Sequence, residues 1–139
     1  MSAEFVDTNV IVYAYDKSDP RKHKAARALL KGLWENQKGR LSIQVLQELY
    51  VVLTRKTPIA MTTEQAISIV ADLGMWKHHT PGIKDLVEAV SIQERYEVSF
   101  WDAMIITSAC RMGCRVLWTE DLNHGQEYAG VEALNPFSN

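Results

Sequence analysis

The chain has few cysteines, no leader of basic and then apolar residues, and no apolar run approaching membrane-spanning length. Because only Cys110 and Cys114 are present, a disulfide framework is not expected to hold the fold, and both thiols are expected to be reduced core residues. Residues 1–4 lack the pattern of a secretory signal. These absences predict a cytoplasmic protein without a membrane partner.

Neither sign of charge dominates the sequence. Its 15 Lys and Arg residues against 17 Asp and Glu residues give a formal net charge of -2. Such a balance argues against a general nucleic-acid coat protein or a membrane-surface protein. It leaves room for an enzyme that acts on nucleic acid, because such an enzyme needs a local basic path and not a basic average.

Several common nucleotide and hydrolase motifs are missing as well. The seven glycines never form GxxxxGK[ST] or GxGxxG, so neither a P-loop nor a dinucleotide-binding turn is indicated. A GxSxG nucleophile elbow is also missing, which leaves a Ser/His/Asp triad unsupported. Chemistry that depends on these devices is therefore not expected.

The sequence does have an alternation of short apolar strands with amphipathic helices. Its 139 residues, 47% of them hydrophobic, suit one domain spanning residues 1–139. Strands are expected near residues 5–6, 41–43, 76–80 and 115–118, with an edge strand at 131–134. Helices are expected at about 10–15 (capped by Thr8 or Asn9), 21–36, 44–56, 62–73, 83–97 and 99–113. This order predicts an α/β domain whose central, mostly parallel sheet of about four to five strands is flanked by helices.

Four acidic residues stand out by their positions. Asp7 and Asp121 follow the first and last central strands, so a parallel sheet brings both to the edge where open α/β folds bind ligands. Asp102 lies in the first turn of a helix that Ser99 caps. Glu48 lies in a helix that is apolar nearly all round, which predicts partial burial of its carboxylate.

Each acid also has a structural interpretation. A strand-end aspartate often caps the following turn, and Asp102 could complete a capping box with Ser99. Glu48 could pair with Arg55. The four positions taken together favour a shared site, since sheet polarity fixes two of them and the other two lie on helices that can flank the same edge.

A cluster of hard carboxylate oxygens suits Mg²⁺ or Mn²⁺ better than zinc. Two such ions about 3.5–4 Å apart can activate a water and stabilise the leaving oxygen of a phosphodiester. This chemistry requires no nucleophilic side chain. The acids therefore predict metal-assisted hydrolysis of a phosphate ester.

Four segments carry a resemblance to a known family. Val6-Asp7-Thr8-Asn9-Val10 resembles the opening motif of the PIN-domain ribonucleases, and residues 42–50, Ser42 to Tyr50, resemble the helix that bears the second acid of that family. Residues 99–103 resemble its third motif and residues 119–125 its fourth, while Asn135-Pro136-Phe137 fits the closing segment. Order and spacing agree along essentially the whole chain, and the nearest group is the VapC-type toxins of type II toxin–antitoxin pairs.

The resemblance implies a metal-dependent endoribonuclease that uses Mg²⁺ or Mn²⁺. It implies that four acids form the metal site: Asp7, Glu48, Asp102 and Asp121. It further implies supporting hydroxyls from Thr8 and Thr119, an ordering role for Asn9, an RNA substrate, a cognate antitoxin and a homodimer. Glu120 is expected to point away from the site.

Three alternatives remain open from the sequence. The chain could be a non-catalytic module of the same fold that binds RNA or protein, although all four acids are retained. It could be a phosphatase that forms an aspartyl phosphate, but that chemistry requires a second aspartate where this chain has Asn9. A DNA substrate is the third, since the metal site alone does not select the sugar.

Overall fold

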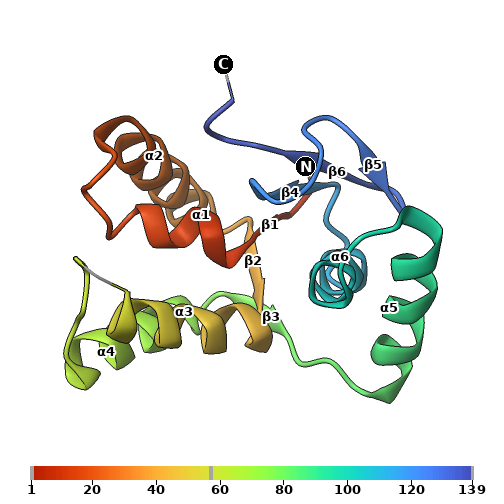
Figure 1. The fold of residues 1–139 in the computed structure, drawn as a ribbon, viewed down its shortest axis with the longest axis horizontal. Coiled ribbons are helices and arrows are strands. Elements are labelled where there is room, and N and C mark those ends of the chain that lie inside the picture. The colour runs from red at the N-terminus through yellow and green to blue at the C-terminus, as the bar shows by residue number, and fades with distance from the viewer. Residues whose placement is uncertain (1, 57, 139) are drawn as a thin grey trace.

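The computed structural model describes residues 2–56 and 58–138 (Figure 1). Its strands are β1 (Glu4–Val6), β2 (Gly39–Ser42), β3 (Lys77–His79), β4 (Val116–Trp118), β5 (Glu127–Tyr128) and β6 (Val131–Leu134). Its helices are α1 (Thr8–Tyr13), α2 (Pro20–Asn36), α3 (Ile43–Arg55), α4 (Thr63–Leu73), α5 (Ile83–Tyr96) and α6 (Phe100–Arg111). Every strand and helix expected from the sequence is present, with shifts of a few residues at the ends.

The strands form one six-stranded sheet in the order β3-β2-β1-β4-β6-β5. All neighbouring pairs are parallel except β5 and β6, which run antiparallel. The expected α/β architecture with a mostly parallel sheet is confirmed. Two details differ: β5 adds a short strand that was not expected, and β6 consequently lies inside the sheet where an edge strand was expected.

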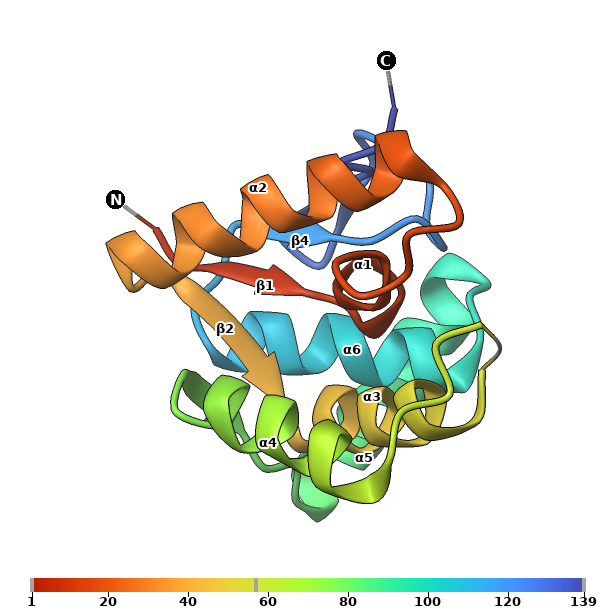
Figure 2. The ribbon, with the colours of Figure 1, turned by 90° about the vertical axis from the view of Figure 1, so that its left-hand side faces the viewer.

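Helices cover both faces of the sheet. Figure 2 shows α2 on one side of β1 and α6 on the other, with α3, α4 and α5 beyond α6. The two faces bury an apolar core along β1, β2, β4, α3 and α6. Its largest fully buried apolar side chains are Phe5, Ile11, Leu41, Leu49, Leu53, Ile106 and Leu117. Burial of each side chain stabilises the fold by about 1.5–3 kcal/mol. This packing holds the strands, and therefore their ends, in place.

Side-chain caps determine where most helices begin. Ser42 caps α3, Ser99 caps α6, and Thr62 forms a capping box with Gln65 at the start of α4. The cap of α1 differs from the expectation, because Asp7 and not Thr8 or Asn9 accepts the first free amide. The chain therefore enters α1 directly from β1, and an acidic residue stands at the junction.

Gly39 allows close packing between β2 and a neighbouring aromatic ring. A Cβ atom at this position would overlap the indole ring of Trp76, which lies directly against the glycine backbone. Trp76 in turn packs edge-to-face on Trp34 of α2 at a centroid distance of 5.8 Å. The small residue thus lets two tryptophans cover the start of β2.

A polar cluster joins β3, α5 and α6 on the other side of the sheet. Asp85 accepts hydrogen bonds from Gly82 N at 2.8 Å and from Arg111 Nε at 2.7 Å, and His79 Nε2 lies 3.3 Å from its second oxygen. The hydrogen bonds from Gly82 and Arg111 hold the pKa of Asp85 below its usual value. His79 Nδ1 lies 2.9 Å from the fully buried hydroxyl of Ser108. The cluster fixes α6 against its neighbours.

Sheet polarity places β1 and β4 with their carboxyl ends at the same edge. Their parallel register pairs Val6 with Trp118, the last residue of each strand. Figure 2 shows both strands pointing toward α1 at this edge. In the part of the chain that the structure describes, no helix has the length and apolar character to cross a bilayer.

Candidate functional site

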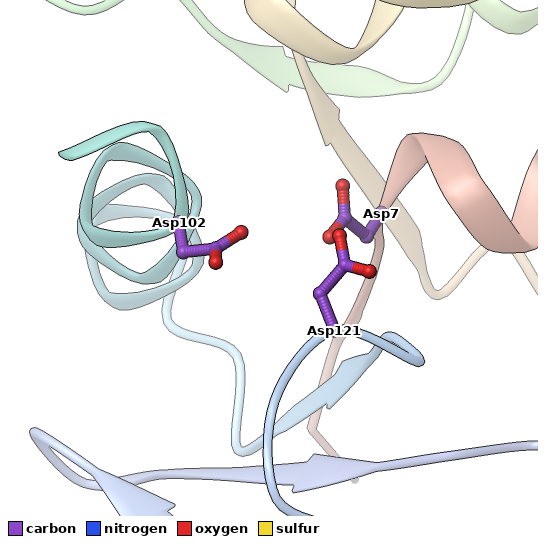
Figure 3. A group of neighbouring side chains, drawn as sticks. All are labelled: Asp7, Asp102 and Asp121. Atoms are coloured by element: carbon purple, nitrogen blue, oxygen red, sulfur yellow. The ribbon is translucent and has the colours of Figure 1, made fainter. Parts of the chain in front are cut away.

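Three carboxylates meet at the carboxyl edge of the sheet (Figure 3). Asp7 comes from the junction of β1 and α1, Asp102 from the first turn of α6, and Asp121 from the loop after β4. One oxygen of each lies within 4.8 Å of one oxygen of each of the others. Segments about a hundred residues apart in the chain therefore bring their acids to one point, as the sequence predicted for these three.

Asp7 is the buried member of the cluster, with 6% of its surface exposed. Its Oδ1 accepts the backbone amide of Thr8 at 2.7 Å, so the carboxylate does cap α1. Its Oδ2 accepts the hydroxyl of Thr119 at 2.9 Å and lies toward the other acids. Burial raises the pKa of Asp7 to about 7, with added repulsion from Asp121 and Glu48 and opposing stabilisation by the hydrogen bonds from Thr119 and Thr8.

The amide of Asn9 connects the first and last motifs. Its Nδ2 donates to Asp121 Oδ2 at 2.8 Å and to Asp7 Oδ2 at 3.3 Å, while its Oδ1 accepts the backbone amide of Glu120 at 3.2 Å. Thr119, only 1% exposed, also accepts the amide of Asp121 at 3.2 Å. These contacts position Asp121, which stands three residues beyond the end of β4.

Glu48 lies beside the cluster and outside it. It is not one of the three acids whose oxygens lie within 4.8 Å of one another. Its Oε1 accepts the Thr8 hydroxyl at 3.2 Å and the Gln44 amide at 3.4 Å. The residue as a whole is exposed at the pocket surface, but its carboxylate is partly buried, as expected. Desolvation still raises the pKa of its carboxyl, with repulsion from Asp102 and Asp121 adding to the effect.

Asp102 does not complete the capping box that the sequence allowed. Its backbone amide donates to the Ser99 hydroxyl at 3.0 Å, but its carboxylate turns toward Asp7 and Asp121. Partial burial raises the pKa of the Asp102 carboxyl, and Asp121 raises it further. The side chain therefore contributes charge to the site and little to the start of α6.

The acids line an open pocket with a volume of about 340 Å³. Its other walls come from α1, α3, the first turn of α6 and the loop after β4, and they include Tyr13, Gln44, Val52, Lys56 and Trp101. Glu120 reaches the rim, where Lys22 binds it at 2.9 Å, so it does not point wholly away as expected. Lys56 is held by Asp16 at 3.3 Å.

The charge of the cluster has no cationic partner among the described side chains. The ion pairs in this part of the chain engage other acids, and none includes Asp7, Glu48, Asp102 or Asp121. Arg55, the partner considered for Glu48, is not among them. Crowded carboxylates of this kind favour either protonation or a bound cation. Their hard oxygens, at three convergent positions, fit a divalent ion such as Mg²⁺ or Mn²⁺.

Sequence reasoning missed two pocket residues that the structure reveals. Gln44 donates to both Glu48 and the backbone carbonyl of Trp101, thereby joining α3 to α6. Lys56 lies at the far end of the same wall. A spacing of four residues from Gln44 through Glu48 to Val52, and on to Lys56, places all of these on one helical face and could have identified them.

Comparison with protein families gives one match. The model of the PIN domain matches residues 5–127, which include all four acids. A search of curated protein sequences found no match. The match covers the fold from β1 through β5.

Solved structures of similar fold cover nearly the whole chain. Toxin VapC20 of Mycobacterium tuberculosis, described as cleaving the sarcin-ricin loop, is 20% identical with a TM-score of 0.64, over 86% of this chain and 90% of that one. VapBC2 of Rickettsia felis, bound to a promoter DNA fragment, is 18% identical with a TM-score of 0.67, over 94% and 96%. FitAB bound to a DNA fragment is 17% identical with a TM-score of 0.75, over 98% and 96%. At these identities the likeness establishes a shared fold.

Proposed function

Because the chain belongs to the PIN domain family, we propose that it is a metal-dependent endoribonuclease that hydrolyses RNA phosphodiester bonds with an activated water. We further propose that it acts in the cytoplasm as the toxin of a type II toxin–antitoxin pair. The observation that carries the proposal is the convergence of Asp7, Asp102 and Asp121 without a cationic partner among the described residues. Such a concentration of charge is costly unless a cation is bound there.

Each pocket residue has a distinct role in this proposal. Asp7, Asp102 and Asp121 would hold Mg²⁺ or Mn²⁺ through their convergent oxygens, and Glu48 on the adjacent wall would hold it directly or through water. Thr8 orients Glu48 through its hydroxyl. Thr119 orients Asp7 through a hydrogen bond of 2.9 Å. The bound ion supplies charge neutralisation at the phosphate and a lowered pKa for the attacking water.

The side chains also control where the phosphate can approach. In the absence of a cation the carboxylates repel the RNA backbone, so binding of substrate at this point depends on the metal. Asn9 keeps the loop of Asp121 next to Asp7 before the ion binds. The residues around the site are thus arranged for reaction without a nucleophilic side chain.

The toxin assignment adds two partners, a cognate antitoxin and a second copy of the chain. The open acidic pocket suits an antitoxin segment that inserts a basic side chain and blocks the metal site. Exposed apolar side chains on α3, α4 and α5, such as Val51, Ile67 and Val87, offer surface for a homodimer. The similarity to structures of VapBC and FitAB complexes supports the antitoxin partner.

Cleavage of a panel of structured RNAs tests the proposed function. We expect cleavage with Mn²⁺ or Mg²⁺, none in EDTA, and a loss of more than about 100-fold in Asp7→Asn while circular dichroism shows an intact fold. Asp72→Asn is the matched control, since Asp72 is exposed on α4 and lies outside the pocket. Matched DNA oligomers test whether the sugar is selected.

Two outcomes would contradict this function. Full cleavage in EDTA or by Asp7→Asn would show that the acids do not act through a metal. A wild-type protein that binds RNA and Mn²⁺ but leaves every RNA intact would favour the non-catalytic binding module.

A further inference from the structure

Trp101 presents an exposed aromatic ring at the rim of the acidic pocket. The residue is 62% exposed although its side chain is large and apolar, and it lines the same pocket as the carboxylates. Exposure of an indole costs apolar burial, so packing does not explain its position. The Trp101 side chain is therefore accessible at the pocket rim.

Trp101 has one packing contact through its ring and one hydrogen bond through its backbone. Phe100 packs edge-to-face against it, with ring centroids 5.1 Å apart and planes inclined by 76°. The backbone carbonyl of Trp101 accepts the amide of Gln44 at 3.3 Å, and the same amide contacts Glu48. This hydrogen bond therefore ties the backbone of Trp101 to the helix that carries Glu48.

Trp101 lies next to the position where a phosphate would react. Trp101 directly precedes Asp102, whose carboxylate belongs to the convergent cluster. A nucleobase is joined to its phosphate through a single sugar, so a phosphate at the cluster carries a base past the adjacent wall. Aromatic side chains bind bases of any sequence by stacking, because every base has a π face.

We infer that Trp101 is the base-stacking residue of the RNA site and binds the nucleobase beside the scissile phosphate. The inference deepens the proposed function and rests on its RNA substrate. Tyr13 and Lys56, which is paired with Asp16, line the same pocket.

The test compares RNA oligomers that differ only in their bases. Fluorescence anisotropy measures binding of labelled oligo(A) and of an abasic ribose-phosphate oligomer of equal length, in CaCl₂ buffer, with gel electrophoresis confirming that each oligomer stays intact. We expect the wild-type protein to bind oligo(A) about tenfold more tightly than the abasic oligomer. Trp101→Leu should bind both equally, and Trp101→Phe should keep most of the preference.

Trp34→Leu provides the matched control, because Trp34 is the other strongly exposed tryptophan and lies outside the acidic pocket. Salt titration supplies a second readout: loss of stacking should leave the slope of log Kd against log salt unchanged. Size-exclusion chromatography checks that the oligomeric state is the same in all variants.

Three results would overturn the inference: a base preference that survives in Trp101→Leu, equal binding of both oligomers by the wild type, or a change in oligomeric state that accounts for the loss. A protein that shows the base preference but cuts no RNA in Mn²⁺ would retain the stacking site and lose the proposed hydrolysis. The two ideas can therefore fail separately.

Discussion

Replacing Asp7 with asparagine should stabilise the metal-free protein at alkaline pH. Burial raises the pKa of Asp7 to about 7 from a usual value of 3.8. Each pKa unit is worth about 1.4 kcal/mol, so ionising this carboxyl inside the fold costs about 4 kcal/mol at pH 8. The buried amide of asparagine carries no charge and avoids that cost, although its hydrogen bonds to Thr8 and Thr119 also change.

The sign of the pH dependence follows from the direction of the shift. The folded protein binds the Asp7 proton more tightly than the unfolded chain, so the wild type is most stable below pH 3.8 in this respect and loses stability as pH rises through 7. At pH 5 the raised pKa of Asp7 destabilises the folded state by only about 2 kcal/mol, because the carboxyl is still mostly protonated in the fold. The asparagine variant lacks this loss.

Urea unfolding in EDTA at pH 5 and pH 8 measures the effect. The stability difference between Asp7→Asn and wild type should increase by about 2–3 kcal/mol in favour of the variant between these pH values. Taking the change in this difference between the two pH values cancels any pH-independent effect of the altered hydrogen bonds. Parallel pH curves for the two proteins would refute the assignment of a buried, uncompensated charge to Asp7.

Adding Mg²⁺ at pH 8 provides the second half of the experiment. A cation bound by the three aspartates should stabilise the wild type in proportion to the logarithm of its concentration above Kd. Asp7→Asn should respond much less. A variant that is both more stable and inactive would show that the site concentrates charge for function at the expense of folding stability.

Two further substitutions test the scaffold around the site. Gly39→Ala forces a methyl group into the indole ring packed across β2 and should cost about 1–3 kcal/mol in urea unfolding, whereas Gly32→Ala in the exposed part of α2 should be neutral or stabilising. Asp85→Asn should cost about 2 kcal/mol at pH 7 through its lost charged contacts to Arg111. Because the pKa of Asp85 is lowered in the fold, this cost should decrease progressively as the pH falls from 3.8 through the lower folded-state pKa, and a constant cost at all pH values would contradict it.

The sequence predicted the fold well where hydrophobic pattern and capping agree. The strand at Glu4–Val6 and the helix at Phe100–Arg111 have strong apolar patterns and clear boundaries, so both were found. β5 was missed because its two residues, Glu127 and Tyr128, are too few to show an alternation. Its pairing with β6 arises from tertiary contact, which moved β6 from the edge into the sheet.

The site was predictable in outline because sheet polarity fixes Asp7 and places the loop of Asp121 nearby. The exposure of Glu48 was not, since an apolar helix sequence does not show which residues lie at a pocket mouth. The cap of α1 also differs from the expectation. The Thr8 hydroxyl donates to Glu48, while the Thr8 amide donates to Asp7, which caps the helix. Residue spacing alone does not predict the bridge from Asn9 to Asp121, although the family resemblance implied an ordering role for Asn9.

The start of α6 affects the repulsion among the three acids when no cation is bound. Asp102 lies in the first turn of this twelve-residue helix, where the aligned peptide dipoles leave partial positive charge. Asp7 likewise accepts a hydrogen bond from the Thr8 amide at the start of α1. The backbone therefore offsets part of the repulsion among the three acids, and the chain can fold before it acquires a cation. Under the proposed function, loading of a cation would then be a separate, reversible event after folding, and it would set when the site can act.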